Sequence, residues 1–191
     1  HQPMVSNNGQ TVLVFNGEIY NFKELKKELN QKHQFRTASD TEVILNGWLE
    51  WGENIFSRLE GMFAIGLWDR RSKTLILARD RMGEKPLYYF YNNGSLAFAS
   101  ELKGLLENPQ IKREVDHESL QLYLSFGQVP SPKSIFKNIF KLEPGNFLVF
   151  QSGRVATKNY WKPDFNQKFL DLSLEEAEKE LENHIAATVK K

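Results

Sequence analysis

The spacing of apolar residues changes once along this chain, and that change restricts the fold more than any other feature of the sequence. After a short apolar run at residues 11–15, apolar residues recur at helical spacing as far as Leu59. From Met62 onward they fall in short runs separated by turn residues, which predicts a series of hairpins. Helices followed by hairpins, without a steady β-α-β alternation, favour a layered α+β protein with antiparallel sheets.

Capping residues and turns predict where these elements begin and end. Ser39 and Glu42 have the spacing of a capping box, and the helix that follows them is expected to end at Gly52. The run 11–15 is expected to be a buried strand that stops at Asn16-Gly17. The other predictions are a helix capped by Asn21, hairpins that pair 62–68 with 74–78, 87–91 with 96–99 and 146–150 with 155–160, and short helices at 101–106 and 117–125.

Composition excludes several classes of function. Hydrophobic residues make up 40% of the 191 residues and aromatic residues 13%, which is enough for a packed core. The net charge of +1 gives no electrostatic reason to expect nucleic acid or an anionic membrane as a partner. The absence of cysteine excludes disulfides and thiol nucleophiles within these residues, and the four histidines lack metal-ligand spacing. A cytoplasmic protein is the default expectation.

The composition and the apolar pattern of the sequence change after Trp161. Residues 162–172 carry Pro163 and alternating charge, and they are expected to form a linker. Residues 173–191 are expected to form one amphipathic helix that begins with a capping box at Ser173 and Glu176. Its apolar stripe has no evident partner upstream, which suggests a second domain; the stripe consists of Leu174, Ala177, Leu181, Ile185 and Val189.

Several positions could carry chemistry, and each also has a simpler structural explanation. Asn16-Gly17 at a strand end is most often a turn, although a side-chain amide and a glycine N–H fixed there could form an oxyanion hole. Asp40 could cap a helix or bind a ligand ammonium. Glu18 could be a solvated turn residue or a ligand contact. The run Arg79-Asp80-Arg81 is better explained as an ion-pair network that shapes a loop.

Taken together, these positions belong to a set of motifs that runs in order from the first residues to Trp161. The set closely resembles the class II glutamine amidotransferase domain of asparagine synthetases. The resemblance rests on the segments FNGEIYN (15–21), SDTEV (39–43), LEGMFA (59–64), ARDRMGEKPLYY (78–89), ASELK (99–103), LEPG (142–145) and YW (160–161).

The resemblance implies a fold and a role for each candidate residue. The fold would be that of the N-terminal-nucleophile hydrolases, with two antiparallel sheets between helical layers (α-β-β-α), here lacking its first strands. Asn16 and Gly17 would form the oxyanion hole, while Glu18 and Asp40 would hold glutamine, with Asp40 facing its α-amino group. Residues 1–161 would be a partial glutaminase domain, 162–172 a linker and 173–191 the first helix of a truncated synthetase domain.

The resemblance also implies what this chain would lack. The family's nucleophile, the thiol of an N-terminal cysteine, would lie upstream of His1, so the chain alone is expected to be inactive and to hold no cofactor. The parent protein would pass ammonia from glutamine to aspartate, which ATP and Mg would activate in the synthetase domain. Two alternatives stay open: an amidotransferase for another carboxylate, and a non-catalytic binding module. Open sheet edges beside 11–15 and 62–78 suggest a homo-oligomer.

Overall fold

Two antiparallel sheets form the centre of the first of two compact units into which the chain divides, His1–Trp161 and Lys162–Lys191. The computed structural model describes residues 2–165 and 172–190. Within those residues the larger sheet has six strands in the order β1-β2-β3-β4-β8-β9, and the smaller has three in the order β6-β5-β7. The strands are β1 (Met4–Val5), β2 (Thr11–Ile19), β3 (Gly61–Asp69), β4 (Thr74–Arg79), β5 (Tyr88–Asn92), β6 (Ser95–Ala99), β7 (Ile139–Lys141), β8 (Asn146–Gln151) and β9 (Arg154–Asn159).

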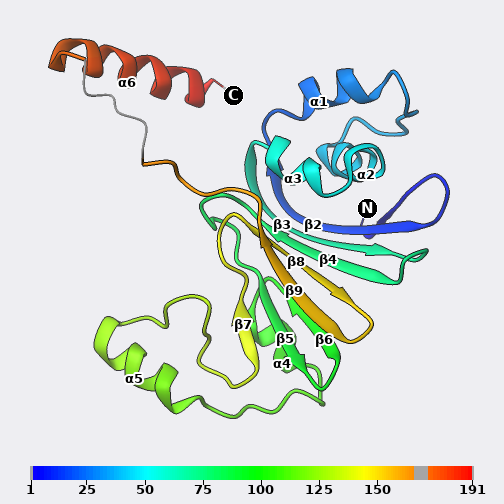
Figure 1. Ribbon diagram of the computed structural model, residues 1–191, viewed down its shortest axis with the longest axis vertical. Helices are drawn as coiled ribbons and strands as arrows, with labels where there is room; N and C mark the ends of the chain where they lie inside the picture. The colour runs from blue at the N-terminus through cyan, green and yellow to red at the C-terminus, as the bar shows by residue number, and fades with distance from the viewer. Residues whose placement is uncertain (1, 166–171, 191) are drawn as a thin grey trace. The chain divides into compact units, whose positions relative to one another are not determined.

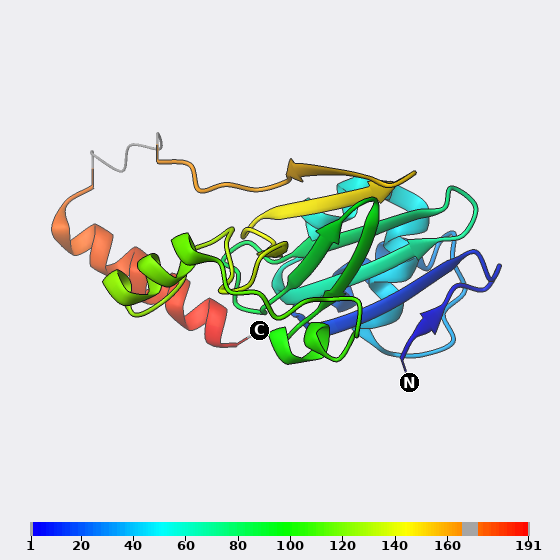
Figure 2. The same cartoon turned by 90° about the horizontal axis from the view of Figure 1, so that it is seen from below.

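Helices cover the outer faces of both sheets (Figure 1). One face of the larger sheet packs against α1, α2 and α3 through a core that includes Leu13, Ile44 and Phe63. The opposite face packs against the smaller sheet, where Leu77 meets residues such as Phe98, and Figure 2 shows the smaller sheet crossing in front of the larger. This order of layers confirms the expected α-β-β-α sandwich. The helices of this unit are α1 (Phe22–Leu29), α2 (Asp40–Trp51), the 3-10 turn η1 (Gly52–Asn54), α3 (Ile55–Arg58), α4 (Leu102–Leu106) and α5 (His117–Phe126).

The second unit contains one helix among its described residues, α6 (Leu174–Val189). Its start has the expected capping box, because Ser173 Oγ accepts from the Glu176 N–H and the Glu176 carboxylate accepts from the Ser173 N–H. The apolar side chains of its stripe, such as Leu181, are exposed. None of the helices in the described parts of the chain is long and apolar enough to cross a membrane.

Strand β2 is longer than the sequence predicts. It continues through Asn16 and Gly17 to Ile19, and it pairs with β3 over its whole length. The expected stop at Asn16-Gly17 is therefore wrong, because the ladder with β3 outweighs the low strand propensity of these two residues. The expected open edge at 62–78 is also wrong, since β3 lies between β2 and β4, and β4 pairs with β8. The three predicted hairpins are confirmed.

The side chain of Asn21 does not cap α1 as expected. Its Nδ2 donates to the Arg58 carbonyl over 2.9 Å, and its Oδ1 accepts from the Glu60 N–H over 3.0 Å. Asn21 therefore ties the end of β2 to the segment that leads into β3, which helps to fix the register of the two strands.

Two glycines permit the close approach of β2 and β3. A Cβ atom on Gly17 would lie 2.1 Å from the Met62 carbonyl oxygen, and one on Gly61 would lie 2.1 Å from the Glu18 carbonyl oxygen. Both residues also have positive φ angles, 154° and 156°. The obstacle is backbone in both cases, so it cannot move aside as a flexible side chain would.

We expect Gly61→Ala to destabilise the fold by about 3 kcal/mol or more, because the new methyl group must push β2 away from β3. Gly127→Ala is the matched control, since Gly127 at the end of α5 has the left-handed helical angles φ 70° and ψ 0°, and no atom lies within 4 Å of the position that its new methyl group would take. The control should lose about 1 kcal/mol through backbone strain alone. Urea unfolding of both variants measures the difference; equal losses would contradict this account of the strand contact.

Candidate active site

On the side away from β3, β1 pairs only with Val12 and Leu13 of β2, and beyond Leu13 this outer edge is completed by side chains. In an antiparallel ladder, alternate residues direct their N–H and C=O groups to opposite sides. The Gln2 amide satisfies both backbone groups of Phe15: its Nε2 donates to the Phe15 carbonyl over 2.6 Å, and its Oε1 accepts from the Phe15 N–H over 2.7 Å. Two residues beyond Gly17, the Ile19 N–H donates to Asp40 Oδ2 over 3.1 Å.

Gly17 lies between these two positions and has the same orientation. Its partner across the ladder, Phe63, turns both backbone groups away from β2, because its N–H donates to Asp80 Oδ2 and its carbonyl accepts from the Asp80 N–H. The Gly17 N–H is thus directed to the outer edge, where no residue that the structure describes accepts it. This half-buried, unpaired backbone donor is available to a ligand.

Asn16 and Glu18 project from the face of β2 that is turned toward the smaller sheet, because side chains alternate along a strand. Asn16 Nδ2 donates to Ser100 Oγ, just beyond β6, over 3.1 Å. A primary amide has two N–H groups, so one remains for a ligand. A pocket of about 230 Å³ adjoins Asn16; it is lined by Gln2, Asn16 and Ser100 together with apolar residues that include Val14, Leu87 and Phe98.

Negative charge gathers near the exposed Glu18 side chain. Partial burial, followed by the charges of Glu84 and Glu18, raises the pKa of Tyr20 above its ordinary value. A phenol is harder to ionise where the local potential is negative. The same potential favours a bound cation, such as the ammonium group of an amino acid.

Asp40 is the first residue of α2, and it reaches β2 through its carboxylate. Oδ1 accepts from the Thr41 N–H over 2.7 Å, a bond within the first helical turn. The bond from the Ile19 N–H joins it to a strand 21 residues earlier, which the helix-start explanation does not account for. A carboxylate can accept about four hydrogen bonds, so Asp40 retains capacity for a ligand N–H.

The structure thus brings the four predicted site residues together at one end of β2. Asn16, Gly17 and Glu18 are consecutive, and Asp40 is bonded to the next residue. From Asn16 to Ile19 the strand rises about 10 Å. Sequence reasoning did not identify Gln2 and Ser100 as contacts of β2; Ser100 lies within the motif ASELK, but nothing in that motif indicates a bond to Asn16.

The run Arg79-Asp80-Arg81 shapes a loop, as predicted, but through backbone hydrogen bonds rather than ion pairs. The carboxylate of Asp80, which is 1% exposed, accepts from the N–H groups of Phe63, Met82, Glu84 and Lys85. Arg79 donates to three carbonyls, those of Gly83, Lys85 and Leu142. The pair therefore holds loop 81–86 to β3, next to the candidate site.

Solved structures with the same fold include two whose names refer to glutamine. A Bacillus subtilis glutamine phosphoribosylpyrophosphate amidotransferase, complexed with ADP and GMP, matches 85% of this chain and 32% of its own with a TM-score of 0.56 at 23% identity. A glutamine aminotransferase class-II domain protein from Silicibacter pomeroyi matches 86% of this chain and 72% of its own with a TM-score of 0.51 at 16% identity. At these identities the likeness shows the fold alone, the α-β-β-α sandwich of two antiparallel sheets between helices.

The family is established by sequence. The family model of the glutamine amidotransferase domain matches residues 1–161, so the chain belongs to that family. Asparagine synthetase [glutamine-hydrolyzing] 1 of Bacillus subtilis is 42% identical over 166 residues, which are 86% of this chain and 26% of the relative. Asparagine synthetase [glutamine-hydrolyzing] 3 of that species is 39% identical over 164 residues, 84% of this chain and 27% of the relative. The chain therefore spans about a quarter of the length of these relatives.

We expect Asp80→Asn to destabilise the protein by about 3 kcal/mol, because an amide NH₂ would face backbone N–H donors in a buried site. Asp69→Asn is the control: Asp69 accepts from the N–H groups of Arg71 and Ser72 in a turn, where asparagine serves equally well. The control should lose less than about 1 kcal/mol. Denaturant unfolding compares the two; a loss at Asp80 no larger than at Asp69 would contradict the role of the loop anchor.

Proposed function

We propose that this chain provides the glutamine-binding part of the glutaminase site of an asparagine synthetase. The observation that carries the proposal is the unpaired Gly17 N–H, which lies beside the Asn16 amide at the open edge of β2. The names of the relatives, glutamine-hydrolysing asparagine synthetases, support glutamine as the nitrogen donor.

Gly17 and Asn16 would act together as an oxyanion hole. Attack on the glutamine side-chain amide turns its carbonyl oxygen into an oxyanion, which needs fixed donors that are already in position. The Gly17 N–H is fixed by the ladder with β3, and the Asn16 amide is held by Ser100. These donors would favour the tetrahedral intermediate over the planar substrate, so they would contribute mainly to kcat.

Asp40 and Glu18 would hold the other end of glutamine. The remaining acceptor capacity of the Asp40 carboxylate suits the α-ammonium group, and the negative charge of the exposed Glu18 side chain would add to its attraction. This contact would exist in the bound substrate as well as in the transition state, so it would contribute mainly to KM.

The attacking atom would come from a residue outside these 191, because the nucleophile that the resemblance implies is a cysteine and the chain contains none. By the family resemblance it would be the thiol of an N-terminal cysteine, and the ammonia released would react with aspartate activated by ATP and Mg elsewhere in the full protein. The names of the relatives favour aspartate over other carboxylates as the acceptor. The cytoplasm remains the expected location.

We expect the 191-residue polypeptide itself to release no glutamate from glutamine. Donors for an oxyanion cannot replace the nucleophile, whose removal lowers kcat by several orders of magnitude, roughly 10⁶-fold in a well-studied hydrolase. A coupled assay for glutamate, with a heat-treated sample as control, measures this. Turnover above that control would show that another group in the chain attacks the amide.

In the complete protein, Asn16→Ala should lower kcat for glutamine hydrolysis by about 100-fold with little change in KM. Asp40→Ala should instead raise KM by about 10-fold or more, because it removes a charged contact to the bound substrate. Asp116→Ala is the control, since Asp116 also accepts N–H groups at a helix start, that of α5. An exchange of the two kinetic effects, or an equal KM effect at Asp116, would contradict the roles proposed here.

A further inference from the structure

We infer that Glu42 is a positioning residue that holds Asp40 in place for the substrate ammonium. The inference rests on the proposed function of Asp40 and adds a residue that does not itself touch glutamine. Glu42 lies half a helical turn beyond Asp40 in α2 and is 2% exposed. A carboxylate this deeply buried is retained only where hydrogen bonds replace its water.

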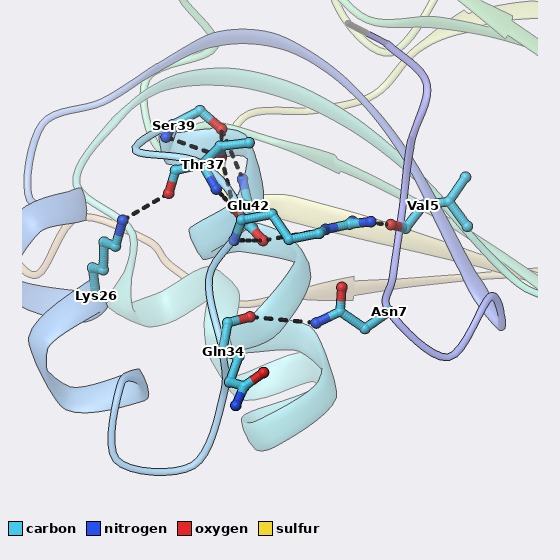
Figure 3. Close-up of polar contacts among 8 residues, drawn as sticks. Val5, Asn7, Lys26, Gln34, Thr37, Ser39 and Glu42 are labelled. Atoms are coloured by element: carbon cyan, nitrogen blue, oxygen red, sulfur yellow. Dashed lines mark hydrogen bonds and ion pairs between the residues drawn. The ribbon is translucent and has the colours of Figure 1, made fainter.

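The Glu42 carboxylate binds the loop that precedes α2 (Figure 3). Oε1 accepts from the Arg36 N–H over 2.9 Å. Oε2 accepts from the Thr37 N–H over 2.7 Å and from the Thr37 hydroxyl over 2.6 Å. Burial alone would raise the pKa of Glu42, but these hydrogen bonds hold that pKa below its ordinary value. The carboxylate therefore stays charged at neutral pH.

This arrangement differs from an ordinary capping box. In a capping box Glu42 would accept from the Ser39 N–H, but here that N–H donates to Thr37 Oγ1 over 3.2 Å instead. The Ser39 hydroxyl still accepts from the Glu42 N–H over 3.4 Å. Glu42 therefore binds Arg36 and Thr37, which precede the N-cap residue Ser39. The Thr37 hydroxyl, held by Glu42, accepts in turn from the N–H of Ser39, the neighbour of Asp40.

The same loop is anchored on two further sides. Lys26 of α1 donates to the Thr37 carbonyl over 2.7 Å. The Arg36 guanidinium donates to the Val5 carbonyl of β1 over 2.6 Å. The loop thus lies between α1 and β1, and Glu42 is the buried charge that joins it to α2.

The position of Asp40 depends on this loop because Asp40 is the residue at which the loop becomes helix. Its long-range bond is a single contact with the Ile19 N–H at 3.1 Å. A shift of the helix start by a fraction of that distance would break the bond and move the carboxylate away from the β2 edge. Ligand-binding groups lose effectiveness with displacements of about 1 Å.

The test compares the steady-state glutaminase kinetics of Glu42→Gln with those of Asp40→Ala in the complete protein. A glutamine side chain at position 42 has only one acceptor oxygen, so it can bind the Arg36 N–H or the Thr37 donors but not both. Its NH₂ group would then face the remaining donors and repel them. We expect KM for glutamine to rise about 5- to 10-fold while kcat stays within about twofold. Glu50→Gln is the matched control, because it removes a carboxylate from the same helix that pairs with Lys32 and His33 instead.

A double mutant separates positioning from general loss of stability. If Glu42 acts through Asp40, Glu42→Gln should change KM little when Asp40→Ala is already present. If Glu42→Gln raises KM as much in the Asp40→Ala variant as in the wild type, the inference is overturned. It is also overturned if Glu42→Gln alone leaves KM unchanged while Asp40→Ala raises it. Both results leave the proposed function intact. An unchanged KM in Asp40→Ala would instead overturn the role of Asp40, and the inference with it.

A second pair of variants keeps the test valid if Glu42→Gln does not fold. Thr37→Val removes the hydroxyl that links Glu42 to Ser39 but leaves the carboxylate in place. Thr37→Ser retains that hydroxyl, so its KM for glutamine should equal that of the wild type, whereas Thr37→Val should raise KM about threefold. Equal KM values for the two variants would overturn the inference.

Discussion

The outer edge of β2 is the constraint on which the candidate site depends. A strand edge normally needs a neighbouring strand, but β1 ends its pairing at Leu13, and beyond it the Gln2 amide and the Asp40 carboxylate satisfy Phe15 and Ile19, with Gly17 between them. Pairing at both flanking positions fixes the strand and leaves one backbone donor open in a rigid setting. Electrostatic stabilisation of a transition state requires such a donor, because it must not reorganise during the reaction.

The packing of the other layers maintains that edge. Gly17 and Gly61 allow β3 to lie close enough to hold β2 along its length, and Asp80 satisfies the backbone groups of Phe63 that face away from Gly17. From the opposite face, Ser100 orients Asn16. The helical layer contributes through α2, whose start presents Asp40 and whose buried Glu42 fixes the preceding loop. The site therefore combines one strand with contacts from both neighbouring layers.

Much of this fold could be predicted from the sequence, because the hairpins and α2 carry their own periodicity and caps. Strands β1 and β7 could not, since two or three residues show no period and pair only when the rest of the sheet exists. The same reason explains the strand end misplaced at Asn16-Gly17, where the ladder with β3 decides. Family motifs identified Asn16, Gly17, Glu18 and Asp40 as site residues, whereas the contacts that Gln2 and Ser100 make with β2 join distant parts of the chain and could not be predicted from the sequence around them.

Residue-resolved amide hydrogen exchange across β2 tests the central claim most directly. In the protein without ligand, the Phe15 and Ile19 amides should exchange slowly because Gln2 and Asp40 accept them, while the Gly17 amide between them should exchange much faster. Saturation with L-glutamine, in a protein that cannot hydrolyse it, should slow exchange at Gly17 selectively. Slow exchange of Gly17 without ligand, or no response to glutamine, would contradict the account of β2 as the substrate edge.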